Sequence, residues 1–379
     1  MTLDRRQFLA GAAAVAVLPM RAQAGATVIE AREALVQIAP EPYGMTPIWG
    51  FDGQAPGPGL RVAQGERLSR RLVNALPQPT SVHWHGIRID NAMDGVPGLT
   101  QDAVQPGDGF DYDFILPDAG TYWYHAHNRS FEQVARGLYG PLVVEEAEAP
   151  DVDDDVVLML DDWRLDPETV MIADDFDNGH DLSHGGRIGN IVTVNGRFDP
   201  VIPVRRNARL RLRLVNAANA RIFSLGLDGM AGWVIALDGM PLERPEPFGE
   251  SIVLAPAQRA DLIVDVTAET GGIASLVEIQ RDGGYGLARF EVGEGAGMSR
   301  DMAPVALPPN PLPSLDGWED APRHEMRIEG GAMRWLDSAM LGDTRLSGQE
   351  LAQLGRFWAL NGRADRPEDP FLDAARDSL

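Results

Sequence analysis

Apolar and polar residues alternate along many short segments of the chain. In one such segment, Leu210, Leu212 and Leu214 alternate with Arg209, Arg211 and Arg213. Successive side chains of a strand point to opposite faces, so this period of two predicts half-buried strands. The 41 Gly and 28 Pro residues punctuate these segments, and no long stretch has a convincing helical period. The pattern therefore predicts an all-β protein of short strands joined by turns.

The strand pattern occurs twice and opens a third time. Residues 49–53 lead to a strand that ends at Asn74, and residues 194–196 lead to a similar strand that ends at Asn216. Residues 357–362 repeat the opening near the end of the chain. This internal repeat predicts serial β-sandwiches, two complete and a third only begun. The predicted boundaries are a targeting segment at 1–24, a first domain at 25–148, a second at 149–296, a linker at 297–322 and the start of a truncated third domain at 323–379.

The first 24 residues have the three parts of an export signal. Arg5 and Arg6 form a twin-arginine pair, an apolar run covers residues 9–18, and Ala22-Gln23-Ala24 is a small-x-small cleavage site. The alternative is a membrane anchor, but the run is only about half of the ~20 residues that a spanning helix needs. We therefore expect a twin-arginine signal peptide, export to the periplasm, and no membrane span in the mature protein.

Charge and cysteine content narrow the function. The formal net charge is −23, which disfavours contact with nucleic-acid phosphates and attracts cations. The chain contains no Cys, so disulfides and thiolate zinc sites are excluded. A blue-copper site is excluded within these residues as well, because it needs a thiolate ligand.

Four of the seven histidines form two H-x-H pairs on predicted strands, namely His83 with His85 and His125 with His127. Side chains at i and i+2 share one face of a strand, so two neighbouring strands can present four imidazoles to one cavity. Hydrogen-bonded core histidines are the alternative interpretation. Because clustered imidazoles repel one another when protonated, whereas a metal binds them in the neutral form, we favour a metal site. Imidazole ligands suit copper, zinc, iron or nickel.

Other candidate ligands are interpreted as structural. The second repeat has Phe223 and Leu225 at the positions that correspond to His83 and His85. His180 and His184 have i,i+4 spacing without a strand context, and we expect solvated loop residues there. Near His324, three methionines at intervals of seven residues are expected to fill a core rather than bind copper, namely Met326, Met333 and Met340.

Together these motifs resemble the laccase-type multicopper oxidases. The resemblance covers nearly all of the chain after residue 24. In the first domain it rests on residues 49–74, 83–86, 94–97, 122–127 and 137–142. In the second domain it rests on residues 195–196, 215–217 and 237–239.

The resemblance implies three cupredoxin-like Greek-key β-sandwiches with copper as the cofactor. In that family a blue copper of the last domain accepts electrons from a small-molecule reducing substrate, and a trinuclear cluster between the first and last domains reduces dioxygen to water. His83, His85, His125 and His127 match the first-domain half of the cluster ligands. The other half and the blue-copper cysteine belong to the last domain, so we expect this chain alone to be inactive and to self-associate through the uncovered face of its first domain.

One carboxylate and two alternatives complete the expectations. Asp94 lies where the family has an acidic residue that helps to move protons, although an aspartate before glycine is often a turn residue. The main alternative function is a copper-free exported cupredoxin scaffold, against which the retained histidines argue. A copper nitrite reductase needs a cysteine, which this chain lacks.

Overall fold

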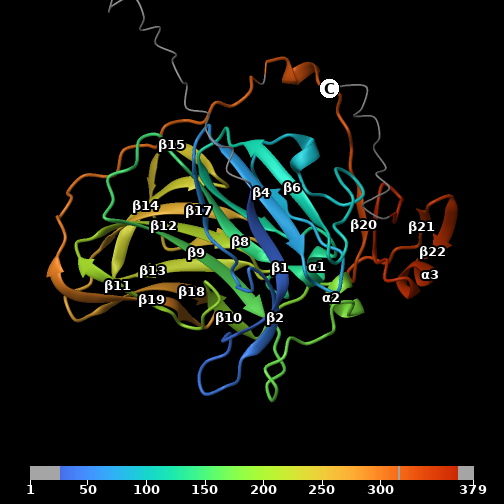
Figure 1. The fold of residues 1–379 in the computed structure, drawn as a ribbon, viewed down its shortest axis with the longest axis horizontal. Helices are drawn as coiled ribbons and strands as arrows, with labels where there is room; N and C mark the ends of the chain where they lie inside the picture. Colours follow the sequence, from blue (N-terminus) through green and yellow to red (C-terminus); the bar gives the residue numbers. More distant parts are fainter. Residues whose placement is uncertain (1–25, 315, 366–379) are drawn as a thin grey trace, which may run out of the picture.

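The computed structural model describes residues 26–314 and 316–365, and their regular secondary structure is almost entirely β-strand (Figure 1). The all-β prediction is confirmed. The predicted signal segment at residues 1–24 lies outside the described residues. The first described strand is β1 (Thr27–Val36), which pairs in parallel with β4 (Arg67–Asn74) and antiparallel with β2 (Thr46–Phe51).

Two four-stranded sheets form the first sandwich. One has the order β2-β1-β4-β6, with β6 at Gly109–Ile115. The other is β3 (Leu60–Ala63), β8 (Tyr139–Glu145), β7 (Gly120–His125) and β5 (His83–His85). Alternate side chains of both sheets meet in one buried core that contains Leu72, Trp84 and Tyr124. This core holds β5 and β7 in place.

A larger pair of sheets follows. The six-stranded sheet is β10 (Ile191–Val194), β9 (Asp154–Trp163), β12 (Arg209–Asn216), β17 (Arg259–Val266), β14 (Met230–Leu237) and β15 (Met240–Pro247). The five-stranded sheet is β11 (Val201–Arg206), β19 (Gly283–Ala296), β18 (Ile273–Gln280), β13 (Phe223–Asp228) and β16 (Ile252–Leu254). Leu212, Phe223 and Leu262 are fully buried in the core between them.

Strand β12 differs from the prediction of a half-buried strand, because all eight of its residues are buried. Its leucines face the core of the second sandwich. Its arginines form a buried ionic network that reaches the first sandwich: Arg211 donates to Asp261 at 2.6 Å and to Glu146 at 2.8 Å, and Arg213 donates to the hydroxyl of Thr121 at 2.9 Å. The polar face of this strand therefore joins the two sandwiches.

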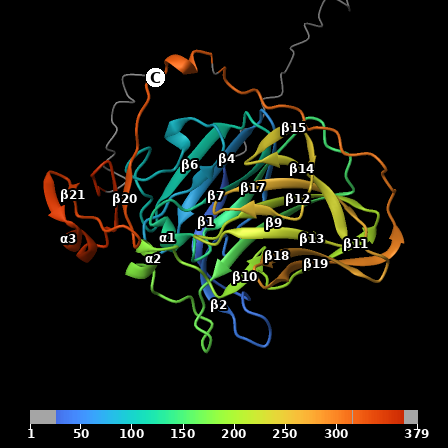
Figure 2. The same ribbon diagram turned by 180° about the vertical axis from the view of Figure 1, so that it is seen from behind.

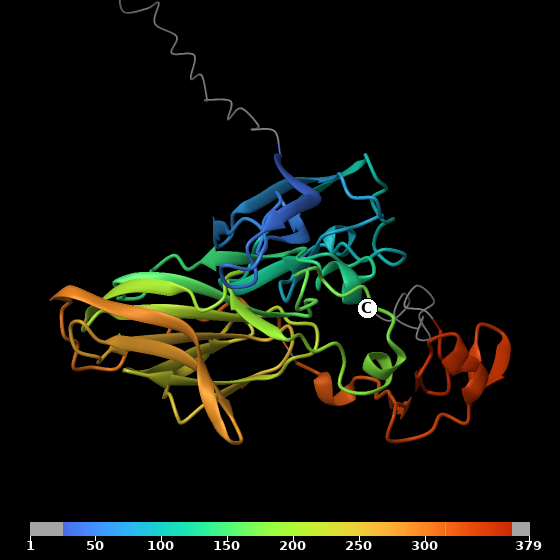
Figure 3. The ribbon, with the colours of Figure 1, turned by 90° about the horizontal axis from the view of Figure 1, so that it is seen from below.

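The remaining described residues form short elements. These are η1 (Asn91–Met93), α1 (Ser130–Gln133), α2 (Gly179–Ser183), η2 (Trp318–Asp320), β20 (Ile328–Gly330), β21 (Ser338–Leu341), β22 (Thr344–Ser347), α3 (Gly348–Gln353) and β23 (Trp358–Leu360). Figure 3 shows that the red C-terminal elements lie to one side of the two sandwiches, next to α2. In the described part of the chain, no helix is long and apolar enough to span a membrane.

The segment that the sequence predicts as a linker runs back along the sandwiches, as the view from behind shows (Figure 2). Asn310 is buried in it and exchanges two hydrogen bonds of 2.8 Å with the backbone of Ala119 in the first sandwich. Leu307 packs with Ile235 and Ile263 of the second sandwich. The exact domain boundaries stay a prediction.

Candidate metal centre

The two H-x-H pairs are built on adjacent strands. β5 pairs antiparallel with β7, and the register places His83 opposite His125 and Trp84 opposite Tyr124. Trp84 and Tyr124 are 1% and 0% exposed in the core of the first sandwich. Because side chains alternate across a strand, burial of the aromatic residues directs the histidines to the opposite face.

The histidine rings converge at this face. His85 and His125 approach to 3.2 Å between Nδ1 of the first and Nε2 of the second, and each of these two residues offers a ring nitrogen that lies within 4.8 Å of one on His83. His127 follows β7, and its ring centroid lies 5.2 Å from that of His83. A set of imidazole nitrogens this close fits one or more transition-metal ions such as copper. Among the described residues it is the only group of three such ligands.

The four histidines line one pocket of about 460 Å³. Both sandwiches and the loop that contains α2 contribute to its wall. Its other lining residues are Trp123, Ser130, Phe131, Val134, Phe176, Asp181, Leu182, Gly186, Arg187, Ala217, Ala218, Asn219, Pro256 and Ala257. The histidines are thus at a junction of the two sandwiches rather than on an isolated strand.

The surroundings keep the imidazoles of His85, His125 and His127 neutral. Burial, followed by the charges of Arg259 and His83, lowers the pKa of His85 to about 3. Burial and then His83 lower the pKa of His125 well below its ordinary value, and the same two causes lower the pKa of His127. Metal ions bind the neutral imidazole, so these histidines are in the ligating form at neutral pH.

Asp94 contacts the cluster mainly through its backbone. The Nδ1–H of His83 donates to the Asp94 carbonyl oxygen at 2.8 Å, and a carboxylate oxygen of Asp94 lies 3.4 Å from the same nitrogen. This bond leaves Nε2 of His83 available to a metal. The next residue, Gly95, has a φ of +77°, and a Cβ there would lie 1.8 Å from the carbonyl oxygen of Val82. Glycine therefore lets the Asp94 turn close against the start of β5.

Comparison with known proteins identifies the family. Residues 34–149 and residues 154–273 match two family profiles, each described as multicopper oxidase. The chain belongs to the multicopper oxidase family. Its members bind copper, and the chemistry of the four imidazoles fits that metal.

Solved multicopper oxidases have the same fold. Lac15 from a marine microbial metagenome is 46% identical with a TM-score of 0.68, and the match covers 77% of this chain and 73% of Lac15. A multicopper oxidase from Pseudomonas thermotolerans is 37% identical with a TM-score of 0.73, over 80% of this chain and 71% of that one. The predicted cupredoxin-like β-sandwich class is confirmed.

Curated relatives extend beyond the matched region. Copper resistance protein A of Pseudomonas syringae pv. tomato is 30% identical, and the match covers 83% of this chain and 59% of the relative. Multicopper oxidase MmcO of Mycobacterium tuberculosis is 32% identical, over 66% of this chain and 53% of the relative. The chain thus spans a little over half the length of these two relatives.

Sequence motifs did not reveal the role of Arg259, a residue of the second sandwich that contacts β7, one of the two strands that carry the histidines. This residue is 5% exposed, and its guanidinium donates to the carbonyl oxygens of Asp238 at 2.8 Å and Thr121 at 3.3 Å. A Cβ on Gly86 would lie 2.2 Å from its Nη2, so Gly86 leaves the space that Arg259 occupies directly after His85. No local pattern could signal this role, because the contact joins residues 173 positions apart.

The residues interpreted as structural have mixed outcomes. Phe223 and Leu225 are both 0% exposed, so the second sandwich has core residues where the first has histidines. Two of the methionines expected to fill a core are instead exposed, Met326 at 54% and Met333 at 95%. The short elements around them bury few side chains, which leaves both at the surface.

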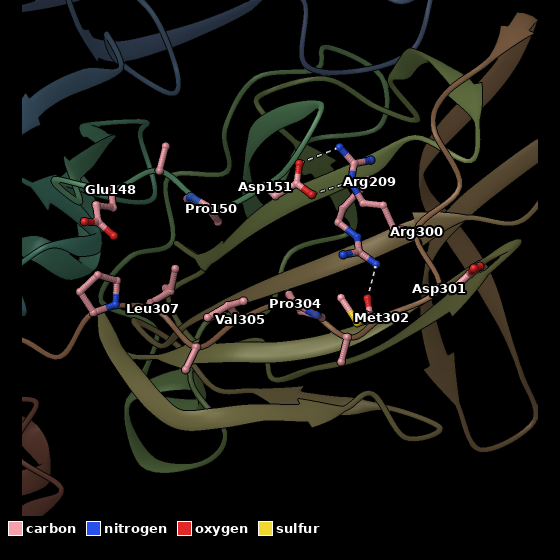
Figure 4. Close-up of a pocket in the computed structure, with 14 residues that line it drawn as sticks. Glu148, Pro150, Asp151, Arg209, Arg300, Asp301, Met302, Pro304, Val305 and Leu307 are labelled. Carbon is pink, nitrogen blue, oxygen red and sulfur yellow. Dashed lines mark hydrogen bonds and ion pairs between the residues drawn. The ribbon is translucent and has the colours of Figure 1, made fainter.

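A second pocket lies under the segment after β19 and has no comparable chemistry (Figure 4). Arg300 is paired there with Asp151 at 2.9 Å, and Arg209 donates to the carbonyl oxygen of Met302 at 3.0 Å. Because both cations already have partners, they attach this segment to the second sandwich rather than face the pocket as free binding groups.

Proposed function

We propose that this chain supplies the first-domain half of the oxygen-reducing copper site of a laccase-like multicopper oxidase. One observation carries the proposal: His83, His85, His125 and His127 come from paired strands and face one pocket, with three of the rings close enough to share metal ions. A copper-free scaffold would not need these imidazoles. The reducing substrate and dioxygen are the proposed small-molecule partners of the complete oxidase.

The roles of the residues follow from their contacts. Copper, when bound, would supply one-electron redox chemistry that couples oxidation of a reducing substrate to reduction of dioxygen to water. The Asp94 carbonyl fixes the ring of His83 through its Nδ1–H, which presents Nε2 to the pocket. Trp123 lies against His125 with a centroid separation of 4.3 Å, covers that ring and restricts water. Burial keeps His85 and His125 neutral and ready to bind.

We propose that the chain alone does not oxidise laccase-type substrates. Electron entry in the family uses a copper–thiolate site, and the 379 residues contain no Cys. The test is to load the purified chain with copper, record its visible spectrum and measure oxygen consumption with a phenolic donor. We expect neither an intense blue band nor turnover. A blue band, or turnover that His125→Ala abolishes, would contradict the proposal.

Copper uptake tests the histidine assignment itself. A His83→Ala, His127→Ala double variant should lose copper from the pocket, since it removes half of the ligands. His324→Ala is the matched control, because His324 is exposed and far along the chain from the cluster. Unchanged uptake in the double variant would favour the copper-free scaffold instead.

Asp94 is proposed to help move protons beside the cluster through its carboxylate, which lies 3.4 Å from the His83 ring. Asp94→Asn should leave copper uptake nearly unchanged, because the hydrogen bond to His83 comes from the backbone. A large loss of uptake would make Asp94 a positioning residue for His83 rather than a proton carrier.

Two further proposals concern location and assembly. Residues 1–24 are proposed to direct export to the periplasm by the twin-arginine route, and an exported protein whose N-terminus still carries Arg5 and Arg6 would refute this. The pocket rim exposes apolar surface such as Phe131, which is 42% exposed, and this face is proposed to favour self-association. Phe131→Asp should then shift sedimentation towards the monomer, whereas a monomeric parent chain would exclude the idea.

A further inference from the structure

His180, on α2, and His184, the residue that directly follows this helix, form an exposed pair. The helix is short but capped, because the Asn178 side chain accepts from the backbone N–H of His180 at 2.9 Å. Residues four apart lie on one side of a helical turn. The two imidazoles stack there with a centroid separation of 4.0 Å and an angle of 26° between their planes, and both residues are exposed. The sequence suggested solvated loop residues, whereas the fold places them on a helical turn with their rings stacked.

The hydrogen bonds of His184 leave one ring nitrogen for a ligand. Its Nδ1 lies 3.0 Å from the carbonyl oxygen of His180 and 2.9 Å from the hydroxyl oxygen of Ser183. The Ser183 hydroxyl donates its own proton to the carbonyl oxygen of Gly179 at 2.7 Å, so both neighbours of Nδ1 accept and Nδ1 carries the proton. The other nitrogen, Nε2, then has its lone pair directed away from the backbone. Donation of one ring N–H to a carbonyl is the arrangement that orients histidine ligands in metal sites. Among the described residues, the ring of His180 has no hydrogen-bond partner.

The backbone of α2 is anchored to the C-terminal elements. The carbonyl oxygen of Leu182 accepts from Nε1 of Trp358 at 2.8 Å, and that of Ser183 accepts from the backbone of Ala332 at 2.8 Å. Asp181 and Leu182 line the pocket of the four cluster histidines. The histidine pair thus belongs to a helical turn whose Asp181 and Leu182 border the copper pocket. Figure 3 shows this turn, in green, between the sandwiches and the red C-terminal elements.

We propose that His180 and His184 form a second metal site on the surface, which binds a divalent transition-metal ion such as Cu²⁺ at the rim of the copper pocket. Two neighbouring imidazoles are a borderline-soft chelating pair that such ions prefer to oxygen ligands, and water completes the coordination. The acidic chain, with a net charge of −23, raises the local concentration of cations. The site has two protein ligands, so it is weaker and exchanges metal faster than the buried cluster.

The test titrates Cu²⁺ alone into the purified chain carrying His83→Ala and His127→Ala, so that the inner pocket does not dominate the signal. Binding is followed by calorimetry and by the nitrogen couplings in the electron paramagnetic resonance spectrum. We expect one site with two nitrogen ligands, and adding His180→Ala and His184→Ala should weaken it by roughly tenfold or more. His324→Ala, which removes a single exposed histidine, should have no effect.

A matched control tests the pairing rather than the number of histidines. In His184→Ala, Gly185→His, the second imidazole moves by one residue, and a Cβ at Gly185 meets no atom within 4 Å, so the chain accepts the change. This variant should bind as weakly as the variant without both histidines. The proposal is overturned if it binds as the parent does, or if removing His180 and His184 leaves the titration unchanged. Copper uptake by the inner pocket is measured separately, in the chain that keeps His83 and His127. Failure of that uptake would contradict the proposed oxidase function but not the surface site.

Discussion

Replacement of His85 by Gln should make the copper-free protein less sensitive to acid. Burial, Arg259 and His83 lower the pKa of His85 in the folded chain to about 3, from an ordinary value of 6.5. Between these two values the unfolded chain takes up a proton at His85 and the folded chain does not. The free energy of unfolding therefore falls as the pH drops below 6.5 and continues to fall towards 3.

The magnitude follows from the size of this shift. A pH of about 5 is about 1.5 units below the ordinary pKa of His85, and each unit corresponds to about 1.4 kcal/mol. At this pH, His85 alone therefore lowers the free energy of unfolding by about 2 kcal/mol. His125 and His127 act in the same direction, because burial also lowers their pKa values. Gln has no proton to gain in this range, so His85→Gln should lose about 2 kcal/mol less than the parent between about pH 7.5 and about pH 5.

The assay is urea unfolding of the copper-free chain at both pH values, followed by tryptophan fluorescence. His324→Gln is the control, since His324 is exposed outside the cluster, and it should keep the parental pH dependence. Copper binds only neutral imidazoles, so adding it should steepen the loss of stability in acid for the parent more than for the variant. Equal losses in the parent and His85→Gln would refute the argument that burial keeps this ring neutral.

Three other variants test the surroundings of the site. Gly95→Ala should cost about 2 kcal/mol or more in thermal unfolding, because its Cβ would lie 1.8 Å from the Val82 carbonyl oxygen at a positive φ. Arg259→Met should lower stability by about 1–3 kcal/mol and weaken copper uptake, since the buried Thr121 carbonyl loses its donor; uptake equal to that of the parent would contradict a role beside His85. Burial and then the charge of Asp162 raise the pKa of Asp161 well above its ordinary value, so the protonated Asp161 stabilises the fold in acid and this stabilisation is lost as the pH rises. Asp161→Asn should therefore stabilise the chain by about 1–2 kcal/mol at neutral pH. Urea titrations at several pH values should also show a weaker pH dependence of the free energy of unfolding for this variant than for the parent.

The interface between the sandwiches links the site to the second domain. The second sandwich contributes no cluster histidine, yet Arg259 lies beside the strand that carries His85, and Ala257 and Ala217 line the pocket of the four histidines. Arg211 and Asp261 are 0% and 1% exposed in the same interface. Removal of one partner of a buried ion pair leaves an uncompensated charge in the interior. Substitution of Arg211 or Asp261 should therefore lower the free energy of unfolding, although neither residue is a histidine of the cluster.

The strands and the metal-ligand candidates could be predicted because both depend on local periodicity. Alternation at period two identifies a strand wherever it occurs, and it also assigns His83 and His85 to one face and Trp84 to the other. Burial of Trp84 at 1% agrees with that assignment. The sequence therefore determined the fold class, the repeat and the shared face of each histidine pair, since each is a property of neighbours along the chain.

Other features were decided only by the tertiary structure. The arginines of β12 have the sequence pattern of a solvated face, but the first sandwich covers them and pairs Arg211 with Glu146. Arg259 reaches the histidine strand across 173 positions, and the stacking of His180 on His184 depends on a turn capped by Asn178. Hydrophobic periodicity reports which face of one element is apolar, but it does not report which polar face another domain will cover. Buried ion pairs, pKa values and contacts between domains arise from that covering, so they became known only with the fold.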